Sequence, residues 1–334
     1  MSQKNTLLIT GASGFTGGRL TEYLLAQYPD AEILATSRNA KAFRHHGKER
    51  VQFQAADLRD KAATEALFVH KPRCVVHCAA LSAPWGKKAD FYEANVVATR
   101  HIADACLAHG VQRLVHISTP SIYFEFRDKY DIRESDPLPD TFINEYAATK
   151  YEAELMLAEY MRKGLEIILL RPRAIIGAGD TVIFPRLIQA HEAGRLRVIG
   201  SGNNIVDVTS VSNVCEAVRC ALEAPAAACG EAYNITNGEP VALWDLIGET
   251  FSQLGLQLNR RRLPYGLAMG LAGLSETLAS FTQKEPSLTR YGVGILAFSC
   301  TLDISKARER LGYSPLQNNA DTVHEFVSWK NAKL

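Results

Sequence analysis

The stretch that decides the fold is TGASGFTG at residues 10–17. It follows an apolar run that predicts a strand over Thr6–Thr10 and precedes a pattern that predicts a helix over Gly14–Tyr28. Gly11 permits a tight turn, Gly14 lets the backbone approach a pyrophosphate, and Gly17 lets helix and strand pack closely. Because the helix N-terminus also presents free N–H groups and a positive dipole end, this strand–turn–helix unit predicts a dinucleotide site.

Short β-branched runs alternate with helical segments through the first half of the chain. Strands are expected at Thr6–Thr10, Glu32–Thr36, Val51–Gln54, Cys74–Cys78, Arg113–Ser118 and Leu165–Leu170. The clearest helices between them are Tyr92–Ala108 and Glu145–Arg162. This alternation is typical of right-handed βαβ units. It predicts the α/β class, with a Rossmann-type doubly wound parallel sheet.

The alternation loosens after Pro172. The strand expected at Ile205–Val208 and the helix at Asn213–Glu223 are interpreted as returning to the main sheet. Later segments are mainly helical: Phe184–Glu192, Leu243–Leu254, Tyr265–Phe281, and Ile304–Leu311 with Asp303 as N-cap and Gly312 as its end. At 334 residues the chain is long enough for two domains. We expect a dinucleotide-binding domain over residues 1–174, to which 205–235 returns, and a smaller, mainly helical substrate lobe over 175–334.

Composition and charge exclude several classes of protein. Lys and Arg number 37 against 36 Asp and Glu, without the basic domain that a nucleic-acid partner requires. The seven cysteines form no C-x-x-C pair, and the nine histidines form no H-E-x-x-H motif, so reduced thiols and no metal site are expected. No apolar run is long enough for a transmembrane segment or a signal peptide. We therefore expect a cytoplasmic protein.

The end of the second predicted strand bears on the cofactor. An NAD site places an acidic residue about 20 residues past the glycine loop to hold the ribose hydroxyl. This chain has Thr36-Ser37-Arg38 there instead. Arg38 can pair with a 2′-phosphate that a carboxylate would repel, which favours NADP(H) over NAD(H), although a solvent-exposed arginine is the alternative. Asp57 and Leu58 follow the third strand and are placed near the adenine.

A catalytic pair lies on the predicted helix 145–162. Tyr146 and Lys150 are four residues apart and therefore share one helix face. A tyrosine with a pKa near 10 needs an adjacent cation to work near neutrality, and Lys150 can supply it. The fifth strand ends in Ser118-Thr119, at the edge where ligands bind in such sheets. A hydroxyl from Thr119, or else Ser118, can orient a carbonyl oxygen, although such a hydroxyl can also serve as a helix cap.

Taken together, the motif at 10–17, Asp57-Leu58, Asn95, Ser118-Thr119 and Tyr146-x-x-x-Lys150 resemble the extended short-chain dehydrogenase/reductases over essentially the whole chain. The resemblance implies a nicotinamide cofactor, with Thr119, Tyr146 and Lys150 as the catalytic triad. The residues expected against the cofactor are Gly11, Ser13, Gly14, Phe15, Gly17, Arg38, Asp57, Leu58, Ala79, Ala80, Asn95, Tyr146, Lys150 and Pro172. A homodimer is also in keeping with this resemblance.

The pattern also narrows the substrate. Sugar dehydratases of the resembled family typically have an Asp-Glu pair after the catalytic Thr, where this chain has Pro120-Ser121. Sugar epimerases usually have an Arg that grips a diphosphate, where this chain has Val206. The run from Leu169 to Arg173 looks instead like the 3β-hydroxysteroid dehydrogenase group, which includes 2-alkyl-3-oxoalkanoate reductases. The segment Tyr265–Phe281 is interpreted either as a wall for an apolar substrate or as a lid helix without ligand contact.

These observations predict an NADP(H)-dependent oxidoreductase that interconverts a secondary alcohol and a ketone. The substrate expected is an apolar 3-hydroxy or 3-keto acid, or a sterol-like ring, with Tyr146 as acid/base. Two alternatives stay open: a nucleotide-sugar epimerase or reductase, and a catalytically silent NADP-sensing protein.

Overall fold

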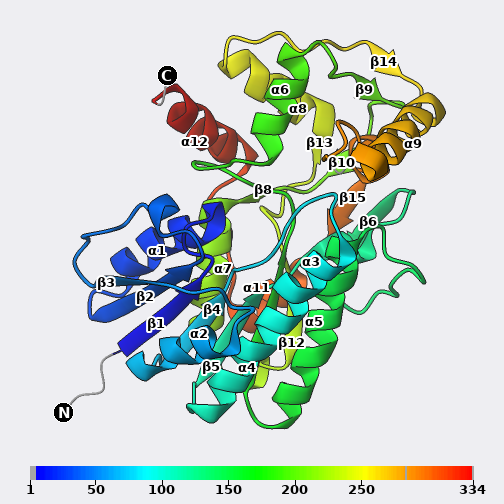
Figure 1. Cartoon of the computed structure of the whole chain (residues 1–334). Helices are drawn as coiled ribbons and strands as arrows, with labels where there is room; N and C mark the ends of the chain where they lie inside the picture. The colour runs from blue at the N-terminus through cyan, green and yellow to red at the C-terminus, as the bar shows by residue number, and fades with distance from the viewer. Residues whose placement is uncertain (1–4, 283, 333–334) are drawn as a thin grey trace.

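A seven-stranded parallel sheet runs through the lower half of the molecule, and the computed structural model describes residues 5–282 and 284–332 (Figure 1). Every pairing within this sheet is parallel. In spatial order its strands are β12 (Glu231–Ile235), β7 (Glu166–Pro172), β5 (Arg113–Ile117), β4 (Cys74–His77), β1 (Asn5–Thr10), β2 (Ala31–Ser37) and β3 (Val51–Ala55). The order reverses at β1, as in a doubly wound fold, so the predicted fold class is confirmed.

Helices cover both faces of this sheet because successive strand residues point to opposite sides. Ile9 packs with α1 (Phe15–Gln27), α7 (Val211–Glu223) and α11 (Ser305–Leu311) on one face. Its neighbour Leu8 belongs to the core on the other face. The second face is covered by η2 (Ala66–His70), α4 (Ala98–Ala108) and α5 (Glu145–Arg162), with α2 (Lys61–Glu65) packed against α4. Short elements beside them are η1 (Ala40–Ala42), α3 (Lys88–Tyr92), the π-helical turn η3 (Glu93–Val97), η4 (Pro120–Tyr123) and η5 (Ala226–Ala228).

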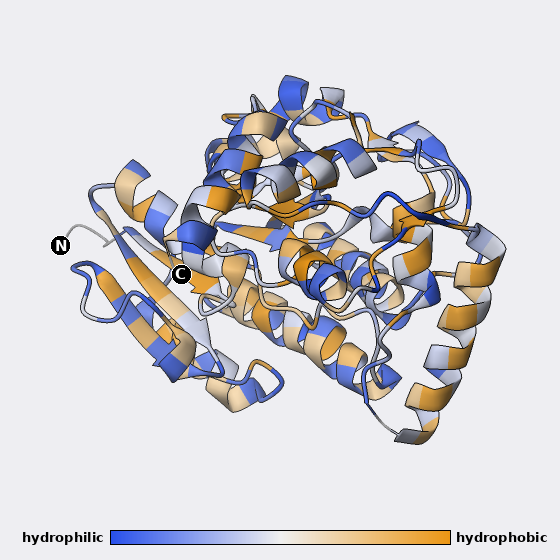
Figure 2. Ribbon diagram, turned by 90° about the horizontal axis from the view of Figure 1, so that it is seen from above, coloured by the Kyte–Doolittle hydropathy of each residue, from blue (hydrophilic) through white to orange (hydrophobic). Residues whose placement is uncertain are grey.

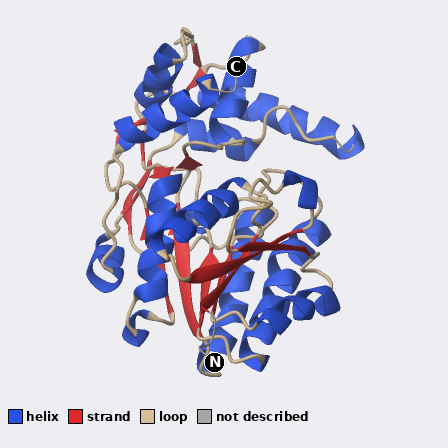
Figure 3. Ribbon diagram, turned by 90° about the vertical axis from the view of Figure 1, so that its left-hand side faces the viewer, coloured by secondary structure: helices blue, strands red, loops and turns tan. Residues whose placement is uncertain are grey.

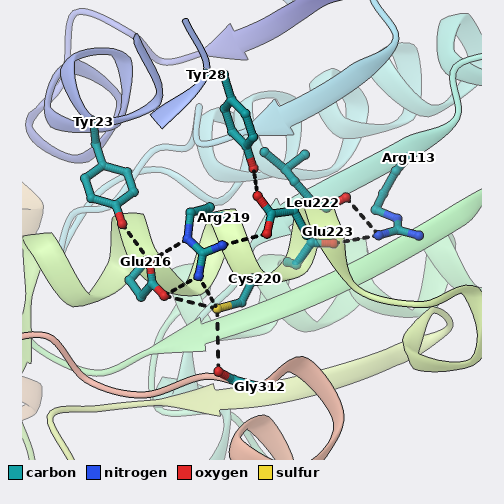
Figure 4. A network of polar contacts seen from close by, with 10 residues as sticks. Tyr23, Tyr28, Arg113, Glu216, Arg219, Cys220, Leu222, Glu223 and Gly312 are labelled. Carbon is teal, nitrogen blue, oxygen red and sulfur yellow. Dashed lines mark hydrogen bonds and ion pairs between the residues drawn. The ribbon is translucent and has the colours of Figure 1, made fainter. Parts of the chain in front are cut away.

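Polar contacts fasten α7 to the sheet and to α1 (Figure 4). The Tyr23 hydroxyl donates to Glu216 at 2.6 Å, and Arg219 bridges Glu216 and Glu223. At the end of α7 the buried Arg113 donates to the carbonyl oxygens of residues 221, 222 and 224 at 2.7–3.1 Å. These carbonyls have no partner within the helix, so Arg113 satisfies them from the neighbouring strand.

The rest of the chain forms a second layer above the carboxyl edge of the main sheet (Figure 3). It contains the sheet β13 (Val241–Ala242), β10 (Ile205–Val206), β15 (Cys300–Leu302) and β6 (Lys129–Ile132), and the pairs β8 (Ile175–Ile176) with β11 (Thr209–Ser210) and β9 (Val198–Ile199) with β14 (Arg262–Leu263). Its helices are α6 (Ile183–Glu192), α8 (Leu243–Gln253), α9 (Tyr265–Thr282), α10 (Arg290–Ala297) and α12 (Asn319–Asn331). Residues of all five helices share one apolar cluster, so this upper lobe has its own core.

Two local expectations differ from the structure. The strand expected at Ile205–Val208 is only two residues long and pairs with β13 and β15, so it does not return to the main sheet. The seventh strand of the main sheet is instead β12, while α7 does pack on that sheet as predicted. At α11, Ile304 occupies the N-cap position, and Asp303 accepts the Ser305 N–H at 2.7 Å. Asp303 therefore supports the first turn from one position further out, and Gly312 ends the helix in the left-handed conformation as predicted.

Helix α9 lies along one edge of the upper lobe and is apolar around most of its circumference (Figure 2). Its buried side chains are small: Ala268, Ala272 and Ala279. Its large apolar side chains face solvent, with exposed fractions of 46–81%, at Leu267, Leu271, Leu274, Leu278 and Phe281. The leucines of this segment therefore face solvent, and the choice between a substrate wall and a lid helix for Tyr265–Phe281 stays a prediction. Among the described residues, no helix is both long and apolar enough to cross a membrane.

Candidate active site

The glycine loop between β1 and α1 is shaped by the absence of side chains. Gly11 has a φ of +68°, and a Cβ there would lie 2.8 Å from the Ala79 nitrogen after β4. A Cβ at Gly17 would lie 2.4 Å from the Gly11 carbonyl oxygen. Both positions therefore require glycine, Gly11 for the turn and Gly17 for close packing, as the spacing predicts. At Gly14, a Cβ would be 3.1 Å from the Gly11 oxygen, so the bare backbone leaves room beside the helix N-terminus.

A buried histidine fastens this loop to the next strand. His77 Nδ1 lies 2.8 Å from the Thr10 hydroxyl, and Nε2 lies 3.0 Å from the Thr99 hydroxyl. The Thr10 oxygen also accepts the Ala79 N–H at 3.2 Å. Burial lowers the pKa of His77 to about 3, so the ring is neutral and serves as a structural connector. Ala79 and Ala80 thus follow β4 directly beside the glycine loop, where the sequence places them.

The strand ends that would meet the adenosine half carry a basic surface. Arg38 is exposed just beyond β2, and no acidic residue stands at Thr36 or Ser37. Asp57, after β3, is held by Arg59 at 2.6–3.1 Å, which keeps the pKa of that carboxyl below its usual range. The Leu58 side chain is buried in the core, so only its backbone can face a ligand.

A cavity adjoins the glycine loop, and its lining includes a basic side chain, Arg44, that no sequence motif indicated. Its lining includes Ser13, Gly14 and Phe15, together with Arg44 and His45 from the segment after β2. Burial lowers the pKa of His45, which leaves Arg44 as the charged member of this pair at neutral pH. Arg44 follows η1 in a polar stretch with no periodic pattern, so its sequence gave no signal of this placement.

Asn95 lies in the π-helical turn η3 and is almost fully buried. Its side chain accepts the Leu81 N–H at 2.7 Å and donates to the Leu81 carbonyl at 3.2 Å. Its amide also donates to the Thr149 hydroxyl at 3.0 Å. Asn95 therefore ties the segment after β4 to helix α5, next to Lys150. Pro172, at the end of β7, is another expected cofactor residue, and it is buried.

The two hydroxyls at the end of β5 have different surroundings. Ser118 donates to the buried Glu154 carboxylate at 2.5 Å, and that carboxylate is also paired with Arg171. The Thr119 hydroxyl caps η4 by accepting the Ser121 N–H at 3.1 Å, and it is near enough to the phenol of Tyr146 to lower the pKa of that phenol. Thr119 is thus the hydroxyl next to Tyr146, and it also has the capping role that the sequence left open.

Tyr146 is the second residue of α5, whose N-cap is Asn144. Burial raises the pKa of its phenol above the ordinary value, although the nearby hydroxyls of Thr119 and Ser82 oppose this rise. The proton therefore stays on Tyr146 at neutral pH, as a general acid requires. Ser82 follows β4 in a loop without any motif, and so the sequence did not indicate it.

Lys150 lies one turn further along α5 and is fully buried. Its ammonium is 2.8 Å from His116 Nε2 and donates to the Ile117 carbonyl at 2.7 Å. Burial lowers its pKa to about 8, although the charge of Glu154 raises it in part. Burial also lowers the pKa of His116 well below its usual range, so the ring is neutral and can accept a hydrogen bond from the Lys150 ammonium. Lys150 is thus positioned from two sides by β5.

The upper lobe contributes a residue that no motif predicted. Tyr291 comes from α10, and its hydroxyl lies 3.0 Å from that of Ser121. Ser121 in turn accepts a hydrogen bond from Thr119 at 3.0 Å. Because α10 also packs on α9, this chain of hydroxyls joins the upper lobe to the end of β5.

The sheet order, the glycine loop and the Thr119–Tyr146–Lys150 cluster occur together in one known family. The sequence model of the "NAD dependent epimerase/dehydratase family" matches residues 7–236. The chain belongs to this family. The expected resemblance to the extended short-chain dehydrogenase/reductases is therefore confirmed, and the protein is an oxidoreductase of this group with a nicotinamide dinucleotide as its implied cofactor. The bare backbone at Gly14 and the basic Arg38 and Arg44 fit the phosphates of such a cofactor.

Curated relatives span nearly the whole chain. The chain is 34% identical to a 3beta-hydroxysteroid-dehydrogenase/decarboxylase (isoform 1) of Arabidopsis thaliana, over 98% of this chain and 84% of that protein. It is 32% identical to a 2-alkyl-3-oxoalkanoate reductase of Stenotrophomonas maltophilia, over 92% of this chain and 94% of that protein. Among solved structures, a dTDP-glucose 4,6-dehydratase of Streptomyces venezuelae shares the fold with a TM-score of 0.78 and 25% identity, over 98% of this chain and 97% of that one.

Proposed function

We propose that this family member is an NADP(H)-dependent oxidoreductase that interconverts a ketone and a secondary alcohol on an apolar substrate. The observation that carries the proposal is the placement of Lys150 against the end of β5, with Thr119 just beyond that strand and Tyr146 one turn before Lys150 on α5. Substrates of the 3-oxo acid or sterol-like type are favoured by the two relatives, whose names describe a 3-oxoalkanoate reductase and a 3beta-hydroxysteroid dehydrogenase.

Each member of the cluster has a separate role in ketone reduction. The cofactor supplies the hydride that adds to the carbonyl carbon. The Thr119 hydroxyl orients the carbonyl oxygen, and the Tyr146 phenol gives its proton to that oxygen as the new C–H bond forms. Lys150, held by His116 and Ile117, places a positive charge near the phenolate that remains. In the reverse direction Tyr146 takes the proton back.

The preference for NADP(H) rests on charge at the adenosine end. Arg38 and Arg44 are both exposed near the glycine loop, and no carboxylate follows β2 where one would hold a 2′-hydroxyl. Asp57 is already paired with Arg59, so it offers little repulsion to a phosphate. Gly11, Ser13, Gly14, Phe15 and Gly17 would hold the pyrophosphate.

An apolar substrate is favoured over a nucleotide sugar by Val206. This residue is 3% exposed in β10 and pairs with Cys300 of β15, so it forms part of the core. A buried valine at this position cannot grip a diphosphate.

The test is NADPH-dependent reduction of 3-keto acids and 3-ketosteroids by the purified chain, with NADH as the comparison. We expect turnover with NADPH, a higher kcat/KM for NADPH than for NADH, and a loss of about 10²–10⁴-fold in kcat for Tyr146→Phe. Tyr92→Phe is the matched control, because Tyr92 is exposed at the end of α3 and has no role in the proposed mechanism. Full activity of Tyr146→Phe would overturn the mechanism, and a preference for NADH would overturn the choice of cofactor.

A further inference from the structure

Arg173 lies immediately after β7, at the carboxyl edge of the main sheet. Its backbone is held firmly: the N–H donates to the Thr209 hydroxyl at 3.1 Å, and its carbonyl accepts from the same hydroxyl at 2.6 Å. The next residue, Ala174, has a φ of +43°, a left-handed conformation that residues other than glycine rarely adopt. The backbone of Arg173 is therefore fixed by Thr209 just before the chain turns at Ala174.

The side chain of Arg173 is largely buried but has no ion-pair partner among the described residues. The residue is only 8% exposed, and its Nε has no hydrogen-bond partner. Within the described parts of the chain, no carboxylate lies at ion-pair distance from it. Since a buried charge without a partner is unfavourable, an arginine in this state is suited to an anion that arrives with the substrate.

The strand register places Arg173 beside the end of β5: Leu170 of β7 lies opposite Ile117 of β5, and its carbonyl accepts the Ser118 N–H at 2.6 Å, so Arg173 leaves the sheet next to Thr119. Its charge acts on the Tyr291 phenol, where it opposes the rise in pKa that burial causes. Tyr291 is joined through Ser121 to Thr119 by the chain of hydroxyls described above. The other charged group near Arg173 is Asp207, whose Oδ2 accepts the Leu302 N–H at 2.7 Å and whose Oδ1 has no partner.

Asp207 does not complete the charge of Arg173. No ion pair within 4.0 Å joins the two side chains among the described residues. Burial raises the pKa of the Asp207 carboxyl to about 6, and the nearby charge of Arg173 opposes this rise only in part.

We propose that Arg173 binds a carboxylate of the substrate, one carbon away from the carbon that is oxidised or reduced. This inference rests on the proposed function and narrows it to substrates whose acid group is attached to the carbon adjacent to the reacting carbon, rather than neutral ketones. A planar guanidinium can hold a carboxylate with two parallel hydrogen bonds. With the carbonyl oxygen at Thr119 and Tyr146 and the acid at Arg173, the substrate is held at two points in one orientation.

The experiment compares one acid with its own ester. A medium-chain 3-hydroxy acid and its methyl ester are oxidised with NADP⁺ by the wild-type chain and by Arg173→Met, and the acid-to-ester ratio of kcat/KM is measured. We expect the substitution to lower this ratio by about 100-fold, mainly through a higher KM for the acid, because only the acid loses an ion pair. Arg173→Lys keeps the charge without the two-pronged geometry and should give an intermediate ratio. Arg261→Met is the matched control, since Arg261 is exposed before α9.

Three outcomes would count against the proposal. If Arg173→Met leaves the ratio unchanged while wild type oxidises both compounds, Arg173 does not bind the acid and the proposed function stands without this inference. If adding Asp207→Asn to Arg173→Met restores oxidation of the acid, the arginine serves only to neutralise Asp207. If wild type oxidises neither compound nor reduces any ketone of the panel, the proposed function itself is wrong. Thermal unfolding of each variant shows that it is folded.

Discussion

Arg171 and Arg173 are two residues apart at the end of β7, and both are buried, yet their surroundings are opposite. Arg171 donates to both oxygens of Glu154 and to the Tyr123 hydroxyl, and Glu154 also accepts from Ser118. Arg173 has no carboxylate at ion-pair distance among the described residues, and its Nε is without a partner. The network of Arg171 is closed, because its charge is matched within the chain. The network of Arg173 is open, because its charge has no ion-pair partner among the described residues.

The difference teaches how a buried charge can be assigned a role. In the closed network every charge is matched within the chain, so its removal should affect folding first. In the open network the hydroxyls of Thr119, Ser121 and Tyr291 and the cation of Arg173 still have capacity for a ligand. The same distinction separates Ser118, which donates to Glu154, from Thr119, which lies near the phenol of Tyr146.

The largest expected difference is in stability. Arg171→Met should lower the free energy of unfolding by about 3–5 kcal/mol, because it leaves Glu154 buried without its cation. Arg173→Met should change it by only about 1 kcal/mol or less, since no pair is broken. Urea unfolding of the two variants measures both values. Equal losses would show that Arg173 is paired in solution and would remove the contrast.

A second comparison concerns the two hydroxyls at the end of β5. Thr119→Ala should lower kcat for ketone reduction by about 100-fold, since it removes the donor that orients the reacting oxygen. Ser118→Ala should instead lower the free energy of unfolding by about 1–2 kcal/mol, with turnover close to wild type. Steady-state kinetics and urea unfolding are measured for each variant. The reverse pattern would transfer the catalytic hydroxyl to Ser118.

The smallest effect is a pH dependence. Lys150 is contacted by the neutral His116 and a carbonyl, and burial lowers its pKa to about 8, so its positive charge is present below that pH and is lost above it. Ketone reduction should therefore be constant at lower pH and fall by about tenfold per pH unit above about 8. The charge of Glu154 raises the pKa of Lys150, so Glu154→Gln should move the fall to lower pH. A rate that stays flat well above pH 8, or a shift in the other direction, would contradict this role.

Local pattern predicted much of the fold and the center of the site. The loop at 10–17 requires glycine at positions 11 and 17 for reasons of backbone conformation and close approach, which any sequence reading can use. Six strands of the main sheet and helix α5 fall within a few residues of their predicted bounds, because alternation and apolar period are properties of short segments, whereas the edge strand β12 was not predicted. Tyr146 and Lys150 share a helix face for the same reason.

Contacts between residues far apart in the chain could not be predicted from local sequence pattern. Tyr291 meets Ser121 across 170 residues, and Cys300 pairs with Val206 across almost a hundred, so no local signal brings them together. The prediction that the strand at 205–208 joins the main sheet is wrong, because its partner β15 comes so late in the chain. The solvent-facing leucines of α9 were likewise hidden in a segment that is apolar on nearly every side.

The sequence by itself determined the doubly wound sheet, the glycine turn and the spacing of tyrosine and lysine, since each depends on residues within a few turns or strands of one another. Only the tertiary structure decided which buried groups are matched. Arg171 and Arg173, like Ser118 and Thr119, are similar residues in neighbouring positions. Their difference comes from Glu154 on α5 and Tyr291 on α10, because a charge or hydroxyl buried in a protein takes its role from the partners that folding brings to it.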